Sequence, residues 1–186
     1  MKAELRSSLL EQRRALTEGD WQKRSLALCA QIIQWPEWGE FDHIGLYRSF
    51  RKEADLHSLL DLSPDKSFYF PLIDQTTGAM EFYGYSGEGA FKHNTWGLFQ
   101  PDGTGKAMPI GANTLIIVPA LAFDDHGHRL GYGKGFYDRY LHRHRLSTLG
   151  VCFREFVLEK LPSESHDQAV DTVMTEEGLR FRTHFC

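Results

Sequence analysis

The sequence predicts an α/β protein, a single three-layer α/β/α domain over residues 1–186 with a mostly parallel central sheet. Two observations support this prediction. Apolar runs of strand length alternate with segments whose apolar residues recur at helical spacing, and this alternation is typical of layered α/β domains. One run, residues 114–123, is continuously apolar, as in strands that are covered on both faces of a parallel sheet.

Two helices are expected before the first strand, over residues 2–16 and 18–34. Thr17, with Asp20 three residues later, predicts an N-cap between them. Each helix has one apolar face, formed by Leu5, Leu9 and Leu16 in the first and by Trp21, Ser25, Leu28 and Ile32 in the second.

Strands and helices alternate in the rest of the chain. Strands are predicted at residues 43–50, 67–72, 80–86, 114–123, 148–153 and 170–173, and helices at 54–62 and 136–146. Residues 84–111, rich in Gly, Pro, Asn and Thr, predict a long irregular surface excursion. Loops of that length are usually functional or mobile.

Composition and charge exclude several classes of protein. A chain of 186 residues with 41% apolar and 25% charged residues is ordinary for one soluble globular domain. Its net charge of −4 argues against a nucleic-acid partner, which requires a basic face. No apolar stretch approaches the roughly 20 residues that cross a bilayer, and the first residues carry no signal-peptide core. We therefore expect a cytoplasmic monomer with no membrane or nucleic-acid partner.

Cysteine and histidine spacing gives no sign of a metal site. Cys29, Cys152 and Cys186 are odd in number and widely separated, which predicts reduced thiols rather than disulfides or a zinc site. The histidines also lack the spacing of a ligand set. No G-x-S-x-G motif supports a hydrolase triad.

The segment from Arg129 to Arg139 carries the strongest functional signal. Its glycines, Gly131, Gly133 and Gly135, lack the Cβ that would keep a ligand from the backbone, and they allow positive φ. Successive N–H groups can then point into one concavity that suits an anion. These properties predict a phosphate-binding loop.

Charged residues around these glycines fit the same interpretation. Lys134 adds a mobile cation, and a helix is expected to begin at Phe136, so that the amides of its first turn also face an anion. Asp138 could hold a magnesium ion by one or two oxygens while phosphates supply other ligands.

The alternative is that this run is only a tight connection between a strand and a helix. It matches neither the P-loop motif nor the dinucleotide fingerprint. However, the order of strand, loop and helix places it at the carboxyl edge of the predicted sheet, where open α/β sheets bind ligands.

Basic residues also lie along one side of the first predicted helix. They are Lys2, Arg6 and Arg13. Charged residues at this spacing commonly form a solvated face. They could equally form a basic arm over a polyphosphate, and the sequence leaves both possibilities open.

Acidic and aromatic residues elsewhere suggest a site for a flat heterocycle. Glu53 and Asp55 follow the strand predicted at 43–50 and could accept hydrogen bonds from an aminopyrimidine ring such as a pterin. They could also be the acidic start of the next helix. Trp96, in the irregular excursion, could cap the core or offer a stacking face.

Motifs along nearly the whole chain resemble those of one enzyme family. They are Lys2-x-x-Leu5-Arg6, Glu53-x-Asp55, Asn94-Thr-Trp96-Gly97-x-x-x-Pro101, Val118-Pro-x-Leu-Ala-Phe-Asp-x-x-Gly-x-Arg129-Leu-Gly-x-Gly-Lys-Gly-Phe-Tyr-Asp138-Arg, and Leu161-Pro-x-x-x-x-Asp167 with Val170-Asp171 and Thr175-Glu176. In order and spacing they resemble the 5-formyltetrahydrofolate cyclo-ligase family, also called methenyltetrahydrofolate synthetases. The chain departs from the family pattern at Leu56, Phe99 and Gln100.

The resemblance implies a three-layer α/β fold and conversion of 5-formyltetrahydrofolate to 5,10-methenyltetrahydrofolate, dependent on ATP and Mg²⁺, with release of ADP and phosphate. The implied ATP-contacting residues are Lys2, Arg6, Arg129, Gly131, Tyr132, Gly133, Lys134, Gly135, Phe136 and Tyr137. The implied catalytic residues are Lys134, Arg129 and Asp138, the implied magnesium ligands are Asp138 and Asp171, and the implied folate-binding residues are Phe50, Glu53 and Trp96.

The chemistry of that reaction suits these residue types. A formamide oxygen is a poor leaving group, and ATP can activate it by phosphorylation. The neighbouring amine then attacks within the same molecule and phosphate leaves, so no enzyme nucleophile is needed. Glycine amides, Lys134, arginines and magnesium would position and neutralise the transferring group.

Two other functions stay open at this point. One is a sugar-phosphate isomerase or transferase on a similar fold, and the other is a diverged, non-catalytic folate- or nucleotide-binding protein. ADP formation that depends on 5-formyltetrahydrofolate excludes the first. Binding of both ligands without product would indicate the second.

Overall fold

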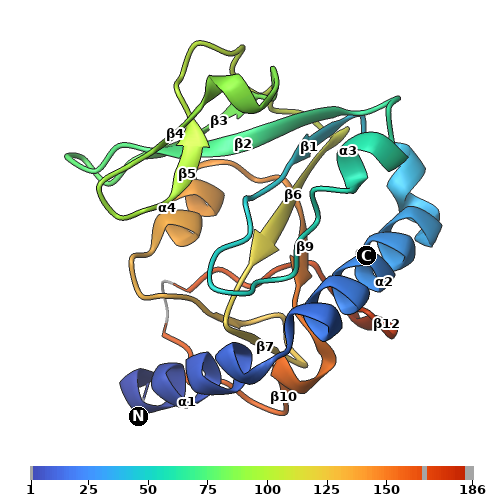
Figure 1. Ribbon diagram of the computed structural model, residues 1–186, viewed down its shortest axis with the longest axis vertical. Helices are drawn as coiled ribbons and strands as arrows, with labels where there is room; N and C mark the ends of the chain where they lie inside the picture. The colour runs from blue at the N-terminus through green and yellow to red at the C-terminus, as the bar shows by residue number, and fades with distance from the viewer. Residues whose placement is uncertain (1, 165–166, 183–186) are drawn as a thin grey trace.

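A computed structural model describes residues 2–164 and 167–182. Its centre is a seven-stranded sheet in the order β12-β11-β9-β6-β1-β2-β3 (Figure 1). These strands are β1 (His43–Gly45), β2 (Ser67–Ile73), β3 (Met80–Gly84), β6 (Thr114–Pro119), β9 (Ser147–Val151), β11 (Thr172–Thr175) and β12 (Gly178–Arg182). The strands from β11 to β2 pair in parallel, while β12 and β3 run antiparallel at the two edges. The predicted mostly parallel sheet is confirmed.

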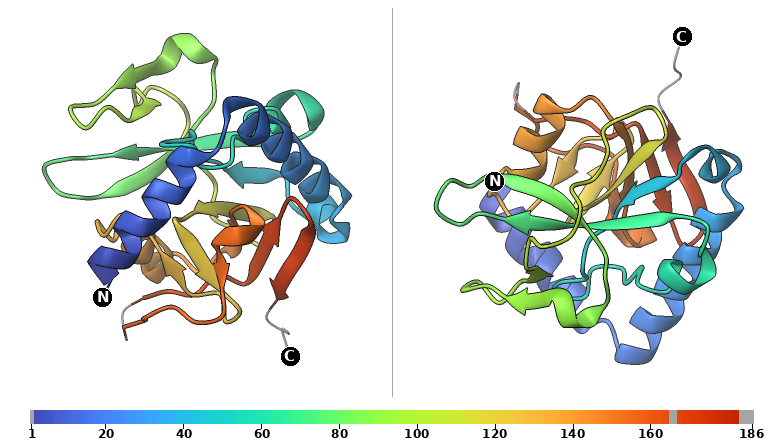
Figure 2. Two further views of the ribbon diagram at one scale, coloured as in Figure 1. Left: turned by 60° about the horizontal axis from the view of Figure 1, so that its bottom comes forward. Right: turned by 90° about the horizontal axis from the view of Figure 1, so that it is seen from above.

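Helices cover both faces of this sheet. They are α1 (Lys2–Ala15), α2 (Glu18–Gln34), α3 (Leu59–Leu62) and α4 (Phe136–Arg143), with short 3₁₀ segments η1 (Pro36–Glu40), η2 (Glu88–Ala90) and η3 (Arg154–Phe156). Figure 2 shows α1 and α2 on one face of the sheet and α4 on the other. The helix α2 begins where predicted, because the Thr17 hydroxyl oxygen accepts a hydrogen bond of 3.1 Å from the Asp20 amide.

The chain order explains this placement of helices. From β1 the chain crosses to β2 on one side, and from β6 it crosses to β9 on the other side. Because crossovers between parallel strands are right-handed, the two connections lie on opposite faces of the sheet. The carboxyl ends of β1 and β6 therefore flank a topological switch point, the position where open α/β sheets bind ligands.

The core lies between the sheet and its helices. Leu115, Ile116, Ile117 and Val118 of β6 are all fully buried. This confirms that β6 is covered on both faces, as its continuous apolar sequence predicts. The predicted helix faces are confirmed too, since Leu9, Ser25, Leu28 and Ile32 are buried, and Leu5, Leu16 and Trp21 pack against the core.

Several element boundaries differ from the sequence predictions. The strand predicted at 43–50 ends at Gly45, and the helix predicted at 54–62 is reduced to Leu59–Leu62. Tertiary hydrogen bonds hold the segment before α3 out of a helix: the Tyr47 hydroxyl donates to the Ala54 carbonyl at 2.6 Å, and the Asp55 amide donates to Ser25 Oγ at 3.0 Å. Local propensity is overridden by these contacts.

The apolar run 114–123 is not one strand but two. The first, β6, ends at Pro119, and the second, β7 (Ala122–Asp124), forms a small sheet with β8 (Arg129–Leu130) and β10 (Val157–Leu158). The excursion at 84–111 contains two strands as well, β4 (Phe91–His93) and β5 (Phe99–Pro101), which pair antiparallel. These short strands, together with β12, carry no strong periodic signal in the sequence.

Smaller corrections concern the second half of the chain. The strand predicted at 148–153 lies at 147–151, the one predicted at 170–173 lies at 172–175, and the helix predicted at 136–146 ends at Arg143. Cys29 and Cys152 are free and buried, as predicted for reduced thiols, and burial raises the pKa of both to about 12. Cys186 lies outside the described residues.

Candidate active site

The glycine loop, residues 131–135, lies at the carboxyl end of β6. After β6 the hairpin of β7 and β8 leads the chain away and back, and the Leu121 amide donates to the Leu130 carbonyl at 2.8 Å. Gly133 and Gly135 have left-handed φ values of 88° and 66°. Gly135 is the N-cap residue of α4, so the loop leads directly into the amino end of that helix. This arrangement is the one expected of an anion site.

Arg6 of α1 lies against this loop. Its Nε donates to the Gly131 carbonyl at 2.9 Å, and its guanidinium carbon is 3.3 Å from the point that a Cβ on Gly133 would occupy. A side chain at Gly133 would therefore crowd the Arg6 guanidinium. Arg6 is thus the residue of this helix face that lies over the loop, and its contact with a polyphosphate stays a prediction.

The other basic residues of α1 have different surroundings. Lys2 contacts Glu164 at 2.7 Å and Asp167 at 3.1 Å, and these carboxylates raise the pKa of Lys2. Arg13 is buried, and its Nη2 donates to the carbonyls of Ala120 and Leu121 at 2.6 and 3.1 Å. The solvated-face alternative is wrong for Arg13, which ties α1 to the end of β6.

Lys134 and Trp96 meet above the loop. The Lys134 Nζ lies 5.5 Å from the Trp96 ring centroid, and the Trp96 and Phe136 rings are 5.9 Å apart with an interplanar angle of 33°. Trp96 remains 43% exposed, so part of its side chain is open to solvent. The excursion at residues 84–111 thus contacts the glycine motif through Trp96, a contact between segments that are far apart in the sequence.

Phe50 and Glu53 meet the loop from the carboxyl end of β1. The Phe50 and Tyr132 rings are 5.8 Å apart, edge to face, and the Tyr132 hydroxyl donates to the Phe50 carbonyl at 3.5 Å. Glu53 Oε2 accepts a hydrogen bond of 3.1 Å from the Phe50 amide. The helix-start interpretation of Glu53 is wrong, because α3 begins only at Leu59.

Burial makes the Glu53 carboxyl unusual. Glu53 is only 6% exposed, and this desolvation raises the pKa of its carboxyl to about 7, although Arg13 Nη1 lies 3.9 Å from Oε1 and opposes the shift. Tyr137 lies in the same buried region: desolvation, and then the Glu53 charge, raise the pKa of its hydroxyl, which has no hydrogen-bond partner among the described residues. Glu53 can therefore be protonated or charged near neutral pH.

Arg129 and Asp138 form a pair beneath the loop. Arg129 Nη2 is 2.5 Å from Asp138 Oδ1, and Arg129 Nη1 donates to the Gln168 carbonyl. The Gln168 amide donates to the same Asp138 oxygen at 3.2 Å. The second carboxylate oxygen, Oδ2, makes no hydrogen bond with the described residues and could take a metal ligand position.

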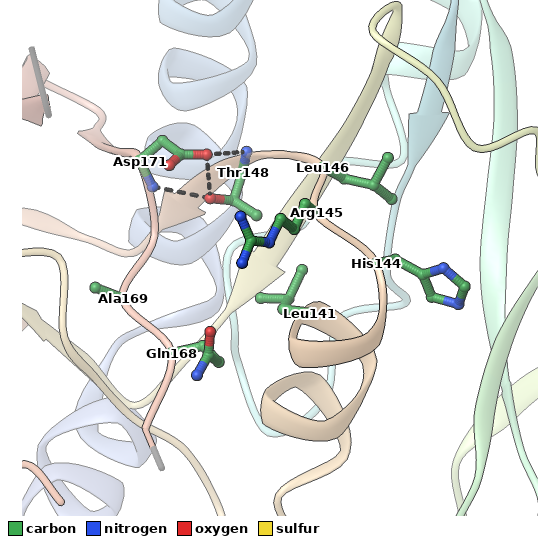
Figure 3. A pocket seen from close by; sticks show the side chains of 8 residues that line it. All are labelled: Leu141, His144, Arg145, Leu146, Thr148, Gln168, Ala169 and Asp171. Atoms are coloured by element: carbon green, nitrogen blue, oxygen red, sulfur yellow. Dashed lines mark hydrogen bonds between the residues drawn. The ribbon is translucent and has the colours of Figure 1, made fainter. Parts of the chain in front are cut away.

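Asp171 lies at the opposite edge of the sheet. Its Oδ2 accepts hydrogen bonds of 2.8 Å from both the amide and the hydroxyl of Thr148, near the amino end of β9. Figure 3 shows this pair in a cavity of about 300 Å³ that Leu141, Arg145 and Gln168 also line. The structure does not bring Asp171 to the glycine loop, which begins at the carboxyl edge.

Sequence reasoning missed the burial of Arg13, and it missed Arg51 altogether. Arg13 falls four residues after Leu9 and therefore lies on the buried face of α1, so the helical spacing in the sequence already indicates that Arg13 is buried. Arg51 lies over the rings of Phe50 and Tyr132, with its guanidinium carbon 4.8 and 5.8 Å from their centroids. Nothing in the sequence marks Arg51, because its place depends on the fold around the switch point.

Two further properties concern metals and membranes. Among residues 2–164 and 167–182, no group of three His, Cys, Asp or Glu side chains could together hold a metal ion. Within the same ranges, no helix is long and apolar enough to span a bilayer.

Known proteins resemble this chain along nearly its full length. A 5-formyltetrahydrofolate cyclo-ligase family model matches residues 1–176. A probable 5-formyltetrahydrofolate cyclo-ligase of Schizosaccharomyces pombe is 28% identical, with 96% of each chain covered, and the mouse 5-formyltetrahydrofolate cyclo-ligase is 27% identical, covering 95% of this chain and 94% of the relative.

Solved structures agree with these relatives. The Aquifex aeolicus 5,10-methenyltetrahydrofolate synthetase superimposes with a TM-score of 0.85 at 29% identity, covering 100% of this chain and 94% of that one. The Mycoplasma pneumoniae 5,10-methenyltetrahydrofolate synthetase, at 17% identity, has the same fold with a TM-score of 0.73 over 94% of this chain and 98% of that one. The chain therefore belongs to the 5-formyltetrahydrofolate cyclo-ligase family, whose members are ATP-dependent ligases.

Proposed function

We propose that this chain converts 5-formyltetrahydrofolate to 5,10-methenyltetrahydrofolate at the topological switch point, with ATP as co-substrate. One observation carries the proposal. The glycine loop after β6, the Phe50–Glu53 turn after β1 and Trp96 of the excursion come together at one place, through the contacts of Tyr132 with Phe50 and of Lys134 with Trp96. A phosphate site thus adjoins an aromatic slot.

In this proposal the ATP phosphates occupy the glycine loop. Arg6 and Lys134 supply positive charge there, and the amides from Gly131 to Tyr137 supply donors. Arg129 holds Asp138 and the neighbouring Gln168 backbone in place through the contacts described above. Lys2 reaches two carboxylates, so any contact of Lys2 with ATP requires exchange of those partners.

The folate would lie between Phe50, Glu53 and Trp96. An exposed tryptophan face suits stacking of the pterin, and a buried carboxyl suits its N–H donors. Because the Glu53 pKa is about 7, Glu53 can accept such hydrogen bonds when charged and can also hold a proton near neutral pH.

The reaction follows from this alignment. The formyl oxygen attacks the γ-phosphorus, and the bond to the bridging oxygen breaks with its electron pair leaving on ADP. The amine N10 then attacks the activated formyl carbon, loses its proton, and the carbon–oxygen bond breaks as phosphate departs. Holding both substrates in line supplies much of the acceleration, since the second step is intramolecular.

Magnesium fits this site through one carboxylate. Magnesium commonly binds by one or two carboxylates together with phosphate oxygens and waters, which agrees with the lack of a three-ligand cluster among the described residues. The open Oδ2 of Asp138 is the ligand that we assign to it. Asp171 is at the other edge of the sheet, so we do not include it in this site. Bound magnesium would neutralise charge on the transferring phosphoryl group.

This magnesium assignment predicts the behaviour of Asp138→Asn. We expect lower activity and a higher magnesium concentration for half-maximal rate, because a neutral amide holds a hard cation less well. Magnesium titrations of both proteins at saturating ATP measure the effect. Thr148→Val, which alters a hydroxyl at the opposite sheet edge, is the control. Superimposable titrations for Asp138→Asn and the wild type would contradict the assignment.

The test of the function itself is product formation. Protein, ATP, Mg²⁺ and 5-formyltetrahydrofolate are mixed, and the absorbance of the methenyl product is followed together with ADP release. We expect both, each dependent on the other substrate. Binding of both ligands without product would instead indicate a non-catalytic relative.

We also propose that the protein is a monomer and that it is cytoplasmic. The free thiols of Cys29 and Cys152, both buried, are consistent with a reducing compartment.

A further inference from the structure

The turn that follows β1 has a strained backbone at two residues. Arg51 and Lys52 have left-handed conformations with φ of 51° and 56°. Among the described residues these are the non-glycine residues with positive φ. Such conformations are unfavourable for residues with a Cβ, they persist only where the surroundings fix them, and they cluster at functional sites.

Hydrogen bonds on several sides fix this turn. The Glu53 amide donates to the Phe50 carbonyl at 3.1 Å, and Trp21 Nε1 of α2 donates to the Glu53 carbonyl at 2.7 Å. The Lys52 ammonium donates to the Leu16 carbonyl at the end of α1. The strained conformation is thus held by two helices as well as by the turn itself.

The turn directs the Arg51 side chain over two aromatic rings. The guanidinium carbon lies 4.8 Å from the Phe50 ring centroid and 5.8 Å from that of Tyr132. Arg51 is exposed and makes no hydrogen bond or ion pair with the described residues. By contrast, Arg13 and Arg129 are tied to backbone carbonyls and carboxylates. Arg51 is therefore a positioned cation with its donors available to a ligand.

The position of Arg51 lies between the two proposed substrates. Phe50 lines the folate slot, whereas Tyr132 stands in the glycine loop between the two glycines that Arg6 contacts. Arg6 approaches this loop from α1, and Arg51 approaches it from the folate side. In the proposed arrangement, Arg51 therefore lies where the phosphate site meets the folate slot.

We propose that Arg51 is a catalytic residue that contacts the γ-phosphoryl group during its transfer to the formyl oxygen. The proposal rests on the function proposed above. As the new oxygen–phosphorus bond forms and the bond to ADP breaks, negative charge is spread over the equatorial oxygens. A planar guanidinium can donate two hydrogen bonds to such oxygens. The rings of Phe50 and Tyr132 hold it in that plane without neutralising its charge.

Three variants test this role. Arg51→Asn removes the charge and retains a residue that tolerates left-handed backbone, whereas Arg51→Lys retains the charge without the planar fork. Lys52→Asn makes the same replacement at the adjacent left-handed residue and is the matched control. Each is compared with the wild type by kcat, by KM for ATP and for 5-formyltetrahydrofolate, and by thermal melting.

We expect Arg51→Asn to lower kcat about 10- to 100-fold, the range for loss of one charge-assisted hydrogen bond. The KM for 5-formyltetrahydrofolate and the melting temperature should change little, and Arg51→Lys should recover part of the rate. Lys52→Asn should melt at a lower temperature, because it loses the contact to Leu16. It should retain its kcat within roughly 3-fold, because the hydrogen bonds from Trp21 to Glu53 and from Glu53 to Phe50 still hold the turn.

The carboxylates of the folate's glutamate are anionic, like a phosphoryl group, and a guanidinium binds either of them. One further comparison separates these two ligands of Arg51. The same variants are assayed with 5-formyltetrahydropteroate, which lacks the glutamate. A kcat loss that persists supports phosphoryl contact, and one that disappears assigns Arg51 to the glutamate and overturns the proposal. An unchanged kcat for Arg51→Asn, or an equal loss for Lys52→Asn, would overturn it as well. A wild-type protein that forms no methenyl product would contradict the proposed function itself.

Discussion

Individual charges around the glycine loop come from distant parts of the chain. Arg6 lies on α1, Arg51 follows β1, and Lys134 is in the loop itself. Each of these side chains is oriented by a partner that carries no net negative charge. Arg6 donates to a backbone carbonyl, and the Arg51 and Lys134 cations lie over aromatic rings. Phosphoryl transfer needs positioning and charge neutralisation rather than an enzyme nucleophile, and these residues can supply both.

Lys134→Ala should retain the fold and weaken the use of ATP. A charge-assisted contact to the transferring phosphate is worth about 2–4 kcal/mol of transition-state stabilisation, which kcat/KM for ATP should reveal. Circular dichroism checks that the fold is retained, since Lys134 is exposed and contacts Trp96 only through its ring face. An unchanged kcat/KM would show that Lys134 is merely a solvated residue.

Glu53→Gln should affect folate selectively. The amide replaces one acceptor with a donor that faces the pterin's donors, so the KM for 5-formyltetrahydrofolate should rise while the KM for ATP stays nearly unchanged. Steady-state kinetics with each substrate varied in turn measure both constants. Equal changes in the two KM values would argue against contact between Glu53 and the pterin.

Elements outside the central sheet bring the two proposed substrate slots together. The hairpin of β7 and β8 returns the chain to the end of β6, and the excursion carrying β4 and β5 reaches the amino end of α4. The excursion is held to the rest of the molecule by Arg48, which pairs with Glu88 and lies over the Phe91 and Phe99 rings at 5.3 and 5.2 Å. Trp96 is therefore presented by an anchored element rather than by a free loop.

Trp96→Leu tests the role of this excursion. Leucine keeps an apolar side chain but removes the ring that contacts Lys134 and Phe136 and that we expect to stack on the pterin. Loss of one stacking contact of about 1 kcal/mol should raise the KM for 5-formyltetrahydrofolate several-fold. Phe99→Leu, a ring that packs within the excursion itself, is the control for general disturbance of this element. If the two variants raise the folate KM equally, Trp96 has no specific part in binding.

At the scale of the whole molecule, the doubly wound sheet separates two edges with different roles. The side chains that we propose to contact the substrates gather at the carboxyl edge, around the switch point between β1 and β6. Cavities of about 300 and 280 Å³ lie at the amino edge and share Thr148 and Asp171. Asp171 bonds the start of β9 to the start of β11 there, which is a structural role in joining parallel strands.

Burial of Glu53 also predicts how stability depends on pH. Its pKa is raised from an ordinary 4.5 to about 7, so the folded protein favours the protonated carboxyl. The resulting stabilisation is complete below pH 4.5 and is lost as the pH rises through 7. Relative to Glu53→Gln, the wild type should lose up to about 3 kcal/mol of unfolding free energy between pH 5 and pH 8. Urea unfolding of both proteins at the two pH values measures this, and a constant difference between them would contradict the burial argument.

The sequence alone determined the class of fold and the long elements, and it predicted the phosphate-binding loop. Helical spacing and the Thr17 cap define α2, continuous apolar residues define β6, and the glycines with Lys134 predict an anion site, because all of these signals are local. Only the tertiary structure decided which charges meet. It buried Arg13 beside Glu53, placed Arg51 over Phe50 and Tyr132, and bonded Asp171 to Thr148 near the amino end of β9. Such pairings depend on strand order and crossover direction, which join residues far apart in the chain and leave no periodic trace in it.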